Sequence, residues 1–316
     1  MRLSFLRCLP LAAAAILLSI AAPAAAQSFP IKWSNHQSSY FKGVGTVVLP
    51  SYHLTFITSK EATAVAGFGA RARLTKSLAG VDEATLRRLT DEAYADLSAR
   101  FTAAGYTVID PETTRAILAQ GGVALQPGNV STAQAGQAIV VNSAVSNGHA
   151  MFGPAAAPAL APFRPGSNPM SWTAQYPKLV AGQPKDTLAV LPYLVIDFGN
   201  LGGKASSGFG RQTATVGGDL AFTVRGVQSG LILVKALDRG RSWPAFIRPE
   251  NEPSIAAAFA TEVPGGGGVR PLQIGTENLT RGDAVVLNLP VWEGLVRQAF
   301  QDYNAAIVAA VVKGRG

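Results

Sequence analysis

Residues 80–121 read GVDEATLRRLTDEAYADLSARFTAAGYTVIDPETTRAILAQG, and this stretch decides the fold class. Asp82 suits a helix N-cap, and the apolar residues that follow it recur at three- and four-residue spacing, which predicts one buried helix face. Gly105 suits the left-handed residue that ends a helix, and residues 106–109 form a short apolar run typical of a buried strand. Asp110–Pro111 then starts a second helix. The sequence predicts a helix–strand–helix unit that packs on a sheet.

The flanking segments extend this unit into an α+β fold. Thr46–Thr58 and Ala62–Leu74 predict a hairpin that turns at Ser59–Glu61, and Thr187–Phe198 is apolar enough for a strand buried on both faces. Pro290–Lys313 carries an apolar stripe at helical spacing. We therefore expect a mixed sheet with a hairpin followed by helix–strand–helix, packed by two long amphipathic helices.

The composition divides the chain into five parts. Residues 1–26 read as a signal peptide, and residues 27–43 as a polar and aromatic N-terminal arm that is loosely attached. Residues 44–145 form the first part of the α/β core. Residues 146–187 are rich in Pro, Gly and Ala and predict a long loop or insertion. Residues 188–316 form the second part of the core, with a glycine-rich loop and the C-terminal helix.

The regions between these main elements give weaker local signals. Residues 122–136 predict a turn-rich linker, which leads into a strand at Gln137–Val145. Asp219–Arg225 and Gly230–Asp238 predict two strands paired around a short turn, and Pro253–Thr261 predicts a short helix. The glycine-rich tract at 199–218 predicts a mobile loop or a hairpin tip.

The N-terminal pattern predicts export. Arg2 and Arg7 precede a short apolar run, and Ala24–Ala26 supplies a small-residue cleavage site before Gln27. The single cysteine, Cys8, lies inside this segment, so we expect the mature chain to have neither a disulfide nor a thiolate metal site. No later segment predicts a transmembrane helix. The expected location is the periplasm or outer envelope, or secretion from a bacterial cell.

The positive charge is concentrated near the start of the mature chain. Residues 27–80 carry six basic side chains and one acidic one, Glu61. Arg71, Arg73 and Lys76 are the candidates for binding an anionic envelope polymer, and a solvated basic surface is the simpler alternative. We expect no nucleic-acid partner, because the chain has no recognisable motif for one.

Motifs for catalysis or cofactor binding are sparse. The spacing around Gly203–Lys204 does not match a P-loop, and the histidines at 36, 53 and 149 lack metal-ligand spacing, so we expect no cofactor and no metal. Three carboxylates remain as weak catalytic candidates: Asp197, Glu250 and Glu252. Asp197 is the strongest, because it ends an apolar strand.

One pattern resembles a known class of exported domains. L-x-x-x-F-x-x-A-G-Y-x-V-I-D at residues 97–110, followed by the second helix, is similar to the α/β envelope domains of penicillin-binding-protein activators and of the curli secretion-channel family. LILVKALDRGRSW at 231–243 is similar to a strand–turn–strand of exported lipoprotein domains. The resemblance covers 44–121 and, more loosely, 188–243. It implies a fold and no catalytic residue, and this chain lacks the lipid-acceptor cysteine after the signal core.

These observations favour an exported, non-enzymatic accessory or binding protein of the envelope or periplasm. Its partner would be an envelope protein or an anionic envelope polymer. A carboxylate-dependent hydrolase of an envelope polymer and a surface or adhesive subunit are the alternatives. The sequence leaves the partner, the oligomeric state and the order of the two loops open.

Overall fold

A computed structural model describes residues 28–33, 38–66, 70–124, 130–136, 143–157, 160, 169–208, 211–238, 242–256, 258–272 and 282–315. The expected signal peptide, most of the expected strand at 137–145 and His36 lie outside these residues. The helices are α1 (Ser38–Phe41), α2 (Glu83–Ala103), α3 (Pro111–Gln120), η2 (Pro169–Val180), η4 (Pro264–Gly266) and α4 (Leu289–Arg315). The strands are β1 (Thr46–Val48), β2 (His53–Ala66), β3 (Ala70–Ala79), β4 (Thr107–Val108), β5 (Val130–Gly136), β6 (Ser143–Phe152), β7 (Thr187–Gly199), β8 (Gly202–Gly208), β9 (Arg211–Gly217), β10 (Leu220–Val224), β11 (Gly230–Ala236), β12 (Ser242–Ile247), β13 (Ser254–Ile255), β14 (Ala260–Val263) and β15 (Asp283–Leu287).

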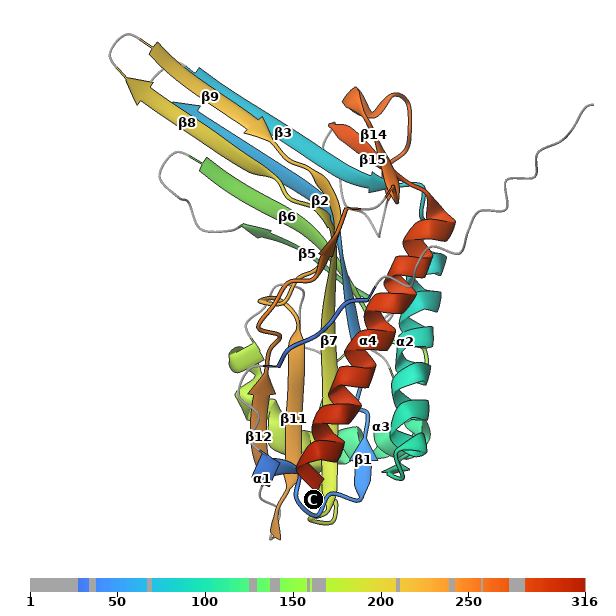
Figure 1. Cartoon of the computed structure of the whole chain (residues 1–316). Helices are drawn as coiled ribbons and strands as arrows, with labels where there is room; N and C mark the ends of the chain where they lie inside the picture. The colour runs from blue at the N-terminus through green and yellow to red at the C-terminus, as the bar shows by residue number, and fades with distance from the viewer. Residues whose placement is uncertain are drawn as a thin grey trace, which may run out of the picture.

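The fold is α+β, as predicted, and its mixed sheet is organised by the two longest strands, β2 and β7 (Figure 1). Residues 53–56 of β2 pair in parallel with residues 193–196 of β7, and residues 59–66 of β2 pair antiparallel with β3. Strand β6 follows β2 along its other edge. Strand β2 therefore exchanges one neighbour for another midway along its length, and the sheet forks there.

Below the fork, helices α2 and α4 cover one face of the sheet and run side by side (Figure 1). They are parallel, because Arg88 contacts Glu293 and Glu92 contacts Arg297, which lies later in α4. Tyr303 of α4 reaches the sheet and donates to the backbone carbonyl of Tyr193 at 3.2 Å. The largest apolar cluster lies between these two helices and the sheet.

The opposite face of the sheet is covered by shorter helices. Ile117 of α3 and Leu179 of η2 pack with Leu191 of β7 and Ile232 of β11 in a second apolar cluster. Every residue of β7 is buried, as expected for a strand with helices on both faces. The body is thus a three-layer arrangement with β7 at its centre.

Above the fork, three hairpins project together as an arm, seen at the upper left of Figure 1. The arm consists of β2–β3, β5–β6 and β8–β9. Small residues form its interior: Ala62, Ala64 and Ala66 of β2 are buried, while Lys204 and Thr213 of the β8–β9 hairpin are exposed. Small side chains let the β8–β9 hairpin pack closely on strands β2 and β3, and as a result the arm has no large apolar core of its own among the described residues.

The helix–strand–helix unit of residues 80–121 is confirmed with its caps. Asp82 accepts a hydrogen bond from the backbone N–H of Thr85, and the residues of α2 that pack inward include the predicted stripe. Gly105 has a φ of 79° after the C-cap, which is the left-handed conformation expected of it. Asp110 accepts from the backbone N–H groups of Glu112 and Thr113 at the start of α3.

The predicted strand at Thr46–Thr58 and its turn at Ser59–Glu61 are wrong. Pro50 has no N–H to give to a ladder, and the chain breaks there into β1 and β2. Strand β2 then continues through Ser59–Glu61 to Ala66. The polar residues that suggested a turn belong to a strand whose lysine is buried in an ion pair.

Three further expectations are corrected by strand pairing. Strands β10 and β11 both pair with β7, end to end along one edge, and not with each other. The expected helix at 253–261 is replaced by β13 and the start of β14, because Ile255 pairs with Phe222 of β10 and this pairing outweighs a weak helical preference. Part of the expected linker at 122–136 is β5, which pairs with β6 at seven positions.

The described parts of the segments expected to be loops or loosely attached are also packed. The glycine-rich tract forms the β8–β9 hairpin, and the expected loop at 146–187 begins inside β6 and contains η2. In the N-terminal arm, Phe29 is fully buried against Phe222, and its N–H donates to Asp302 at 2.7 Å. Among the described helices, none combines the length and apolarity needed to cross a bilayer.

Candidate functional site

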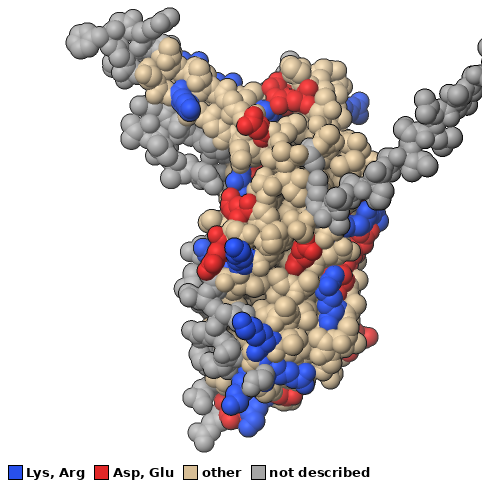
Figure 2. Space-filling model, viewed as in Figure 1, with Lys and Arg blue, Asp and Glu red and all other residues tan. Residues whose placement is uncertain are grey.

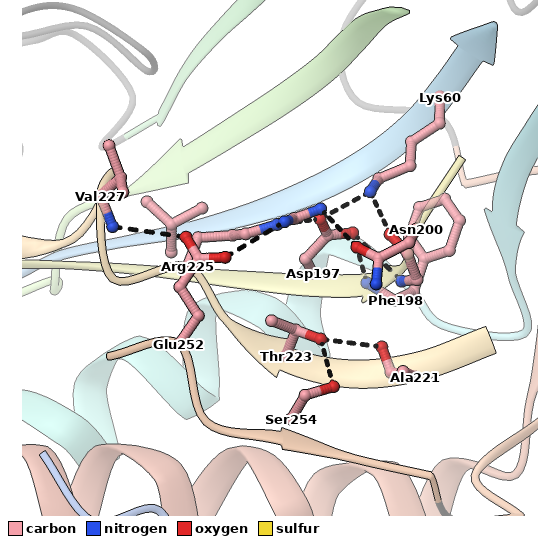
Figure 3. Close-up of polar contacts among 12 residues, drawn as sticks. Lys60, Asp197, Phe198, Asn200, Ala221, Thr223, Arg225, Val227, Glu252 and Ser254 are labelled. Atoms are coloured by element: carbon pink, nitrogen blue, oxygen red, sulfur yellow. Dashed lines mark hydrogen bonds and ion pairs between the residues drawn. The ribbon is translucent and has the colours of Figure 1, made fainter. Parts of the chain in front are cut away.

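The candidate site lies at the fork of the sheet, where Lys60 of β2 fills the gap left as β7 diverges. Lys60 is 2% exposed. Its ammonium binds Asp197 Oδ2 at 2.6 Å and also donates to the backbone carbonyl of Gly199, at the end of β7 (Figure 3). Burial lowers the pKa of Lys60, and the negative charge of Asp197 opposes this effect. The lysine thus links the middle of β2 to the end of β7, beyond the residues through which the two strands pair.

Asp197 is fully used by these structural contacts. Its Oδ2 also accepts from Nε of Arg225 at 2.5 Å, and its Oδ1 accepts from the backbone N–H groups of Phe198 and Gly199 at 2.7 and 3.2 Å. The residue is 1% exposed. A carboxylate that accepts from two cations and two backbone N–H groups has no free lone pair facing solvent for chemistry.

Arg225 links this buried pair to the surface (Figure 3). It follows β10, and its guanidinium donates to Asn200 Oδ1 at 3.1 Å and to Glu252 Oε2 at 3.5 Å. Glu252 in turn receives the backbone N–H of Val227 at 3.4 Å. The turn that follows β10 is therefore held against both the end of β7 and the segment before β13.

A pocket of about 350 Å³ opens beside this cluster. Its lining comes from β2, β6, the end of β7, the turn after β10 and the segment before β13, and it comprises Lys60, Asn147, Asn200, Leu201, Arg225, Val227, Gln228 and Glu252. Ligands of α/β proteins commonly bind beyond the carboxyl ends of strands, where neighbouring strands part. The fork provides such a crevice.

A second buried lysine lies directly beside the first. Lys76 of β3 is the cross-strand partner of Lys60, and it is also 2% exposed. Its ammonium binds Glu262 at 2.7 Å and the backbone carbonyl of Gly218 at 3.1 Å. Lys60 and Lys76 therefore hold the two ends of the β8–β9 segment, at Gly199 and Gly218.

The two glycines are needed for the close approach at this stem. A Cβ on Gly218 would lie 1.8 Å from the carbonyl oxygen of Asn200, and a Cβ on Gly199 would lie 2.5 Å from that of Asp219. Any other residue would force the two chain segments apart. The glycine-rich composition thus serves packing at the base of the arm.

The structure brings two of the three predicted carboxylates to the same arginine and leaves the third apart. Asp197 and Glu252 meet at Arg225, whose guanidinium lies between them. Glu250 is exposed and takes no part in the cluster, although its backbone N–H donates to the carbonyl of Lys32. Asp197 is absent from the pocket lining, so the arrangement is not a pair of carboxylates facing each other across a cleft.

The three predicted basic residues also differ in their environments. Arg71 and Arg73 are exposed on the outer face of β3, and Arg73 pairs with Glu61 at 2.6 Å. Lys76 is buried and paired with Glu262, so its charge is not available to a polymer. Basic side chains are visible on the arm in Figure 2. The polyanion hypothesis is therefore reduced to Arg71 and Arg73.

Sequence reasoning missed Lys60, Asn147, Arg225 and Gln228. The sequence predicts a turn at Lys60, and Arg225 is 28 residues from Asp197 with no intervening motif. Only topology brings them together.

In the described part of the chain, no group of His, Cys, Asp and Glu side chains has the arrangement of a metal site. Comparison with known protein families, curated proteins and solved structures found no match to this chain.

Proposed function

We propose that the protein is an exported, non-enzymatic accessory protein of the cell envelope, and that its hairpin arm contacts a partner in the periplasm or outer envelope. The observation that carries this proposal is the state of Asp197, the strongest catalytic candidate, whose two oxygens accept from Lys60, Arg225 and two backbone N–H groups. A nucleophile or general base needs a free lone pair near its substrate. The fork is built to hold the arm.

The arm itself is built for contact. Its hairpins extend away from the helices that stabilise the body (Figure 1). Its outer faces carry exposed polar residues such as Lys204, Ser206, Thr213 and Thr215. Extended strands with polar outer faces add little to the main core, so their length is better explained by an interaction than by stability. The resemblance to envelope domains of the penicillin-binding-protein activator and curli secretion-channel type belongs to the same proposal.

Site-specific photocrosslinking in the native envelope tests this function. A photoreactive side chain at Thr213, exposed on β9, should give a discrete crosslinked product that persists at high salt. The same group at Ala99, exposed on α2, is the matched control and should give none. Equal crosslinking from both positions, or none from Thr213, would contradict the proposal.

The salt dependence identifies the class of partner. Surface charges are screened within about 3 Å at ~1 M salt, so binding to an anionic polymer through Arg71 and Arg73 would be lost there. Replacing both arginines with glutamine would then abolish retention, whereas Arg115→Gln on the exposed side of α3 would not. A protein partner that docks on the arm should tolerate both changes.

A further inference from the structure

The β8–β9 hairpin is attached to the arm differently from the other two hairpins. It forms a two-stranded sheet of its own and packs on β2, β3 and β6 (Figure 1). Its strands alternate between exposed residues and residues that are only half-buried, such as Ala205 and Ala214. Among the hairpin residues whose burial the structure describes, none is buried. Small, half-buried side chains contribute little apolar burial, so this hairpin can open while the body stays folded.

The hairpin covers one face of β2. Above the fork, buried residues of β2 alternate with half-buried ones, and the buried ones are Lys60, Ala62, Ala64 and Ala66. They share one face, because residues two apart in a strand point the same way. Two lysines tie the stem of the hairpin to this face: Lys60 binds the carbonyl of Gly199, before β8, and Lys76 binds that of Gly218, after β9, at 3.1 Å. The hairpin is thus a light cover that is anchored at its stem.

A histidine without a hydrogen-bond partner lies on the side of β6 that faces this stem. Asn147 of β6 pairs with Lys60, so the two residues share a face, and His149 lies two positions further along on the same face. Asn147 and Lys60 line the pocket together with Asn200 and Leu201, which directly precede β8. His149 is 1% exposed, and neither ring nitrogen has a partner within the described chain. The closed stem therefore keeps this imidazole from water.

The charges around His149 leave no counter-ion for a second cation. Lys60 of β2 and Asp197 of β7 are the charged groups that act on it, in opposite directions. Asp197 already accepts from both Lys60 and Arg225. Strand β5 has no ionisable residue, and Lys204 of β8 is exposed on the outer face of the hairpin. A protonated imidazole would therefore be buried beside a lysine whose carboxylate partner is shared with an arginine.

We propose that protonation of His149 in mild acid releases the β8–β9 hairpin from β2 and β6. Once the stem lifts, the imidazole is hydrated and binds a proton readily, whereas the closed stem keeps it neutral. Protons therefore shift the equilibrium toward the open hairpin. The release depends on the stem alone, whatever the arm contacts.

The size of the effect follows from the two environments of His149. A hydrated histidine titrates near a pKa of about 6.5, whereas burial holds the pKa of His149 at about 4 while the stem is closed. Between pH 7 and pH 5, the ratio of open to closed hairpins should therefore rise about 20-fold. His53 should not contribute, because it pairs with Tyr193 in the body, below the fork.

The accessibility of a thiol beneath the hairpin measures this release. In the full chain with Cys8→Ser, Ala64→Cys places a thiol at a buried position that the hairpin covers, and Thr213→Cys places one on the exposed face of β9 as the reference. The rate of reaction of the first with a pyridyl disulfide, divided by that of the second, reports the open fraction. This ratio should rise about 20-fold from pH 7 to pH 5. Ala299→Cys, in the buried face of α4, reports unfolding of the body and should react far more slowly.

Histidine variants assign the effect. With His149→Leu, the relative rate of Ala64→Cys should change less than about twofold between pH 7 and pH 5, and His149→Gln, which does not ionise either, should give the same result. His53→Gln is the matched control and should keep the full rise. A relative rate that is constant with pH, or a rise that persists in both His149 variants, would overturn the proposal. Equal rates for Ala64→Cys and Ala299→Cys would also overturn it, because the thiol would then be reached only through unfolding of the body.

Discussion

Mild acid should destabilise this protein through two buried histidines. His53 is completely buried, and its Nε2 accepts the backbone N–H of Leu160 at 3.2 Å. Burial lowers its pKa to about 3. His149 is 1% exposed, and neither ring nitrogen has a hydrogen-bond partner in the described chain. Burial lowers its pKa to about 4, with a further decrease from Lys60 and an opposing contribution from Asp197. Both imidazoles are therefore neutral in the folded state.

The size of the effect follows from linkage. An unfolded histidine titrates near a pKa of about 6.5, above both folded values, so protons bind more readily to the unfolded chain. The stabilisation is present above about pH 6.5 and is lost progressively as the pH falls toward the folded pKa values of about 3 and 4. At pH 5, each histidine has lost about 2 kcal/mol of stabilisation relative to pH 7, which gives about 4 kcal/mol together. That loss is a large fraction of the stability of a typical domain.

Urea unfolding at pH 7, 6 and 5 measures this loss. Carboxyl groups contribute little to the change in stability between pH 7 and pH 5. Glu92 and Glu293, for example, have lowered pKa values in the folded state, so the stabilisation they provide is lost mainly below the ordinary glutamate pKa of about 4.5. His149→Leu removes one titrating group and fills a similar volume. It should roughly halve the decrease in unfolding free energy between pH 7 and pH 5, and combination with His53→Gln should nearly abolish it. Parallel pH dependences for the wild type and His149→Leu would refute the reasoning.

Two further predictions concern stability at neutral pH. Lys60→Met should lower the free energy of unfolding by about 3 kcal/mol, because it removes a buried partner of Asp197. Lys76→Met should lower it less, because the acidic partner of Lys76 is 32% exposed and can be hydrated. Urea midpoints, compared at equal m-value, measure the two losses. Gly294→Ala should stabilise the protein by about 1 kcal/mol, because the position is exposed inside α4 and has open space for a Cβ. Gly105→Ala should destabilise it by a similar amount, because Gly105 has a φ of 79°. The two variants should shift the thermal unfolding midpoint in opposite directions.

The elements that the sequence predicted well are those whose signals are local. Asp82 and Asp110 cap helices through contacts within three residues, and Gly105 ends a helix through its own backbone conformation. The nearly continuous apolar sequence of β7 predicts a strand buried on both faces, and every residue of β7 is buried. Asp197 was found for the same reason, because an acid at the end of an apolar strand is conspicuous. Its role could not be inferred, since both cationic partners come from distant strands.

The glycine-rich tract shows where composition is ambiguous. A mobile loop and a tightly packed hairpin stem both favour glycine, the first for backbone freedom and the second for lack of a Cβ. Gly199 and Gly218 belong to the second class, since each lies against a backbone carbonyl. No local pattern distinguishes the two cases. The distinction depends on which chain segment approaches, and that segment is set by the tertiary fold.

The burial pattern of β2 changes at the fork of the sheet. Residues 53–57 are apolar or buried on both faces, as is typical of an inner strand, whereas residues 59–66 alternate between buried and half-buried positions. The change falls where β2 exchanges β7 for β3. The polar Ser59–Glu61 marks this exchange, and a turn would produce the same local signal. Lys60 lies where the two strands part, and its side chain is long enough to bind the end of the departing strand. Its burial is therefore a consequence of the fork, and the pocket beside it exists because one side chain does not fill the whole gap.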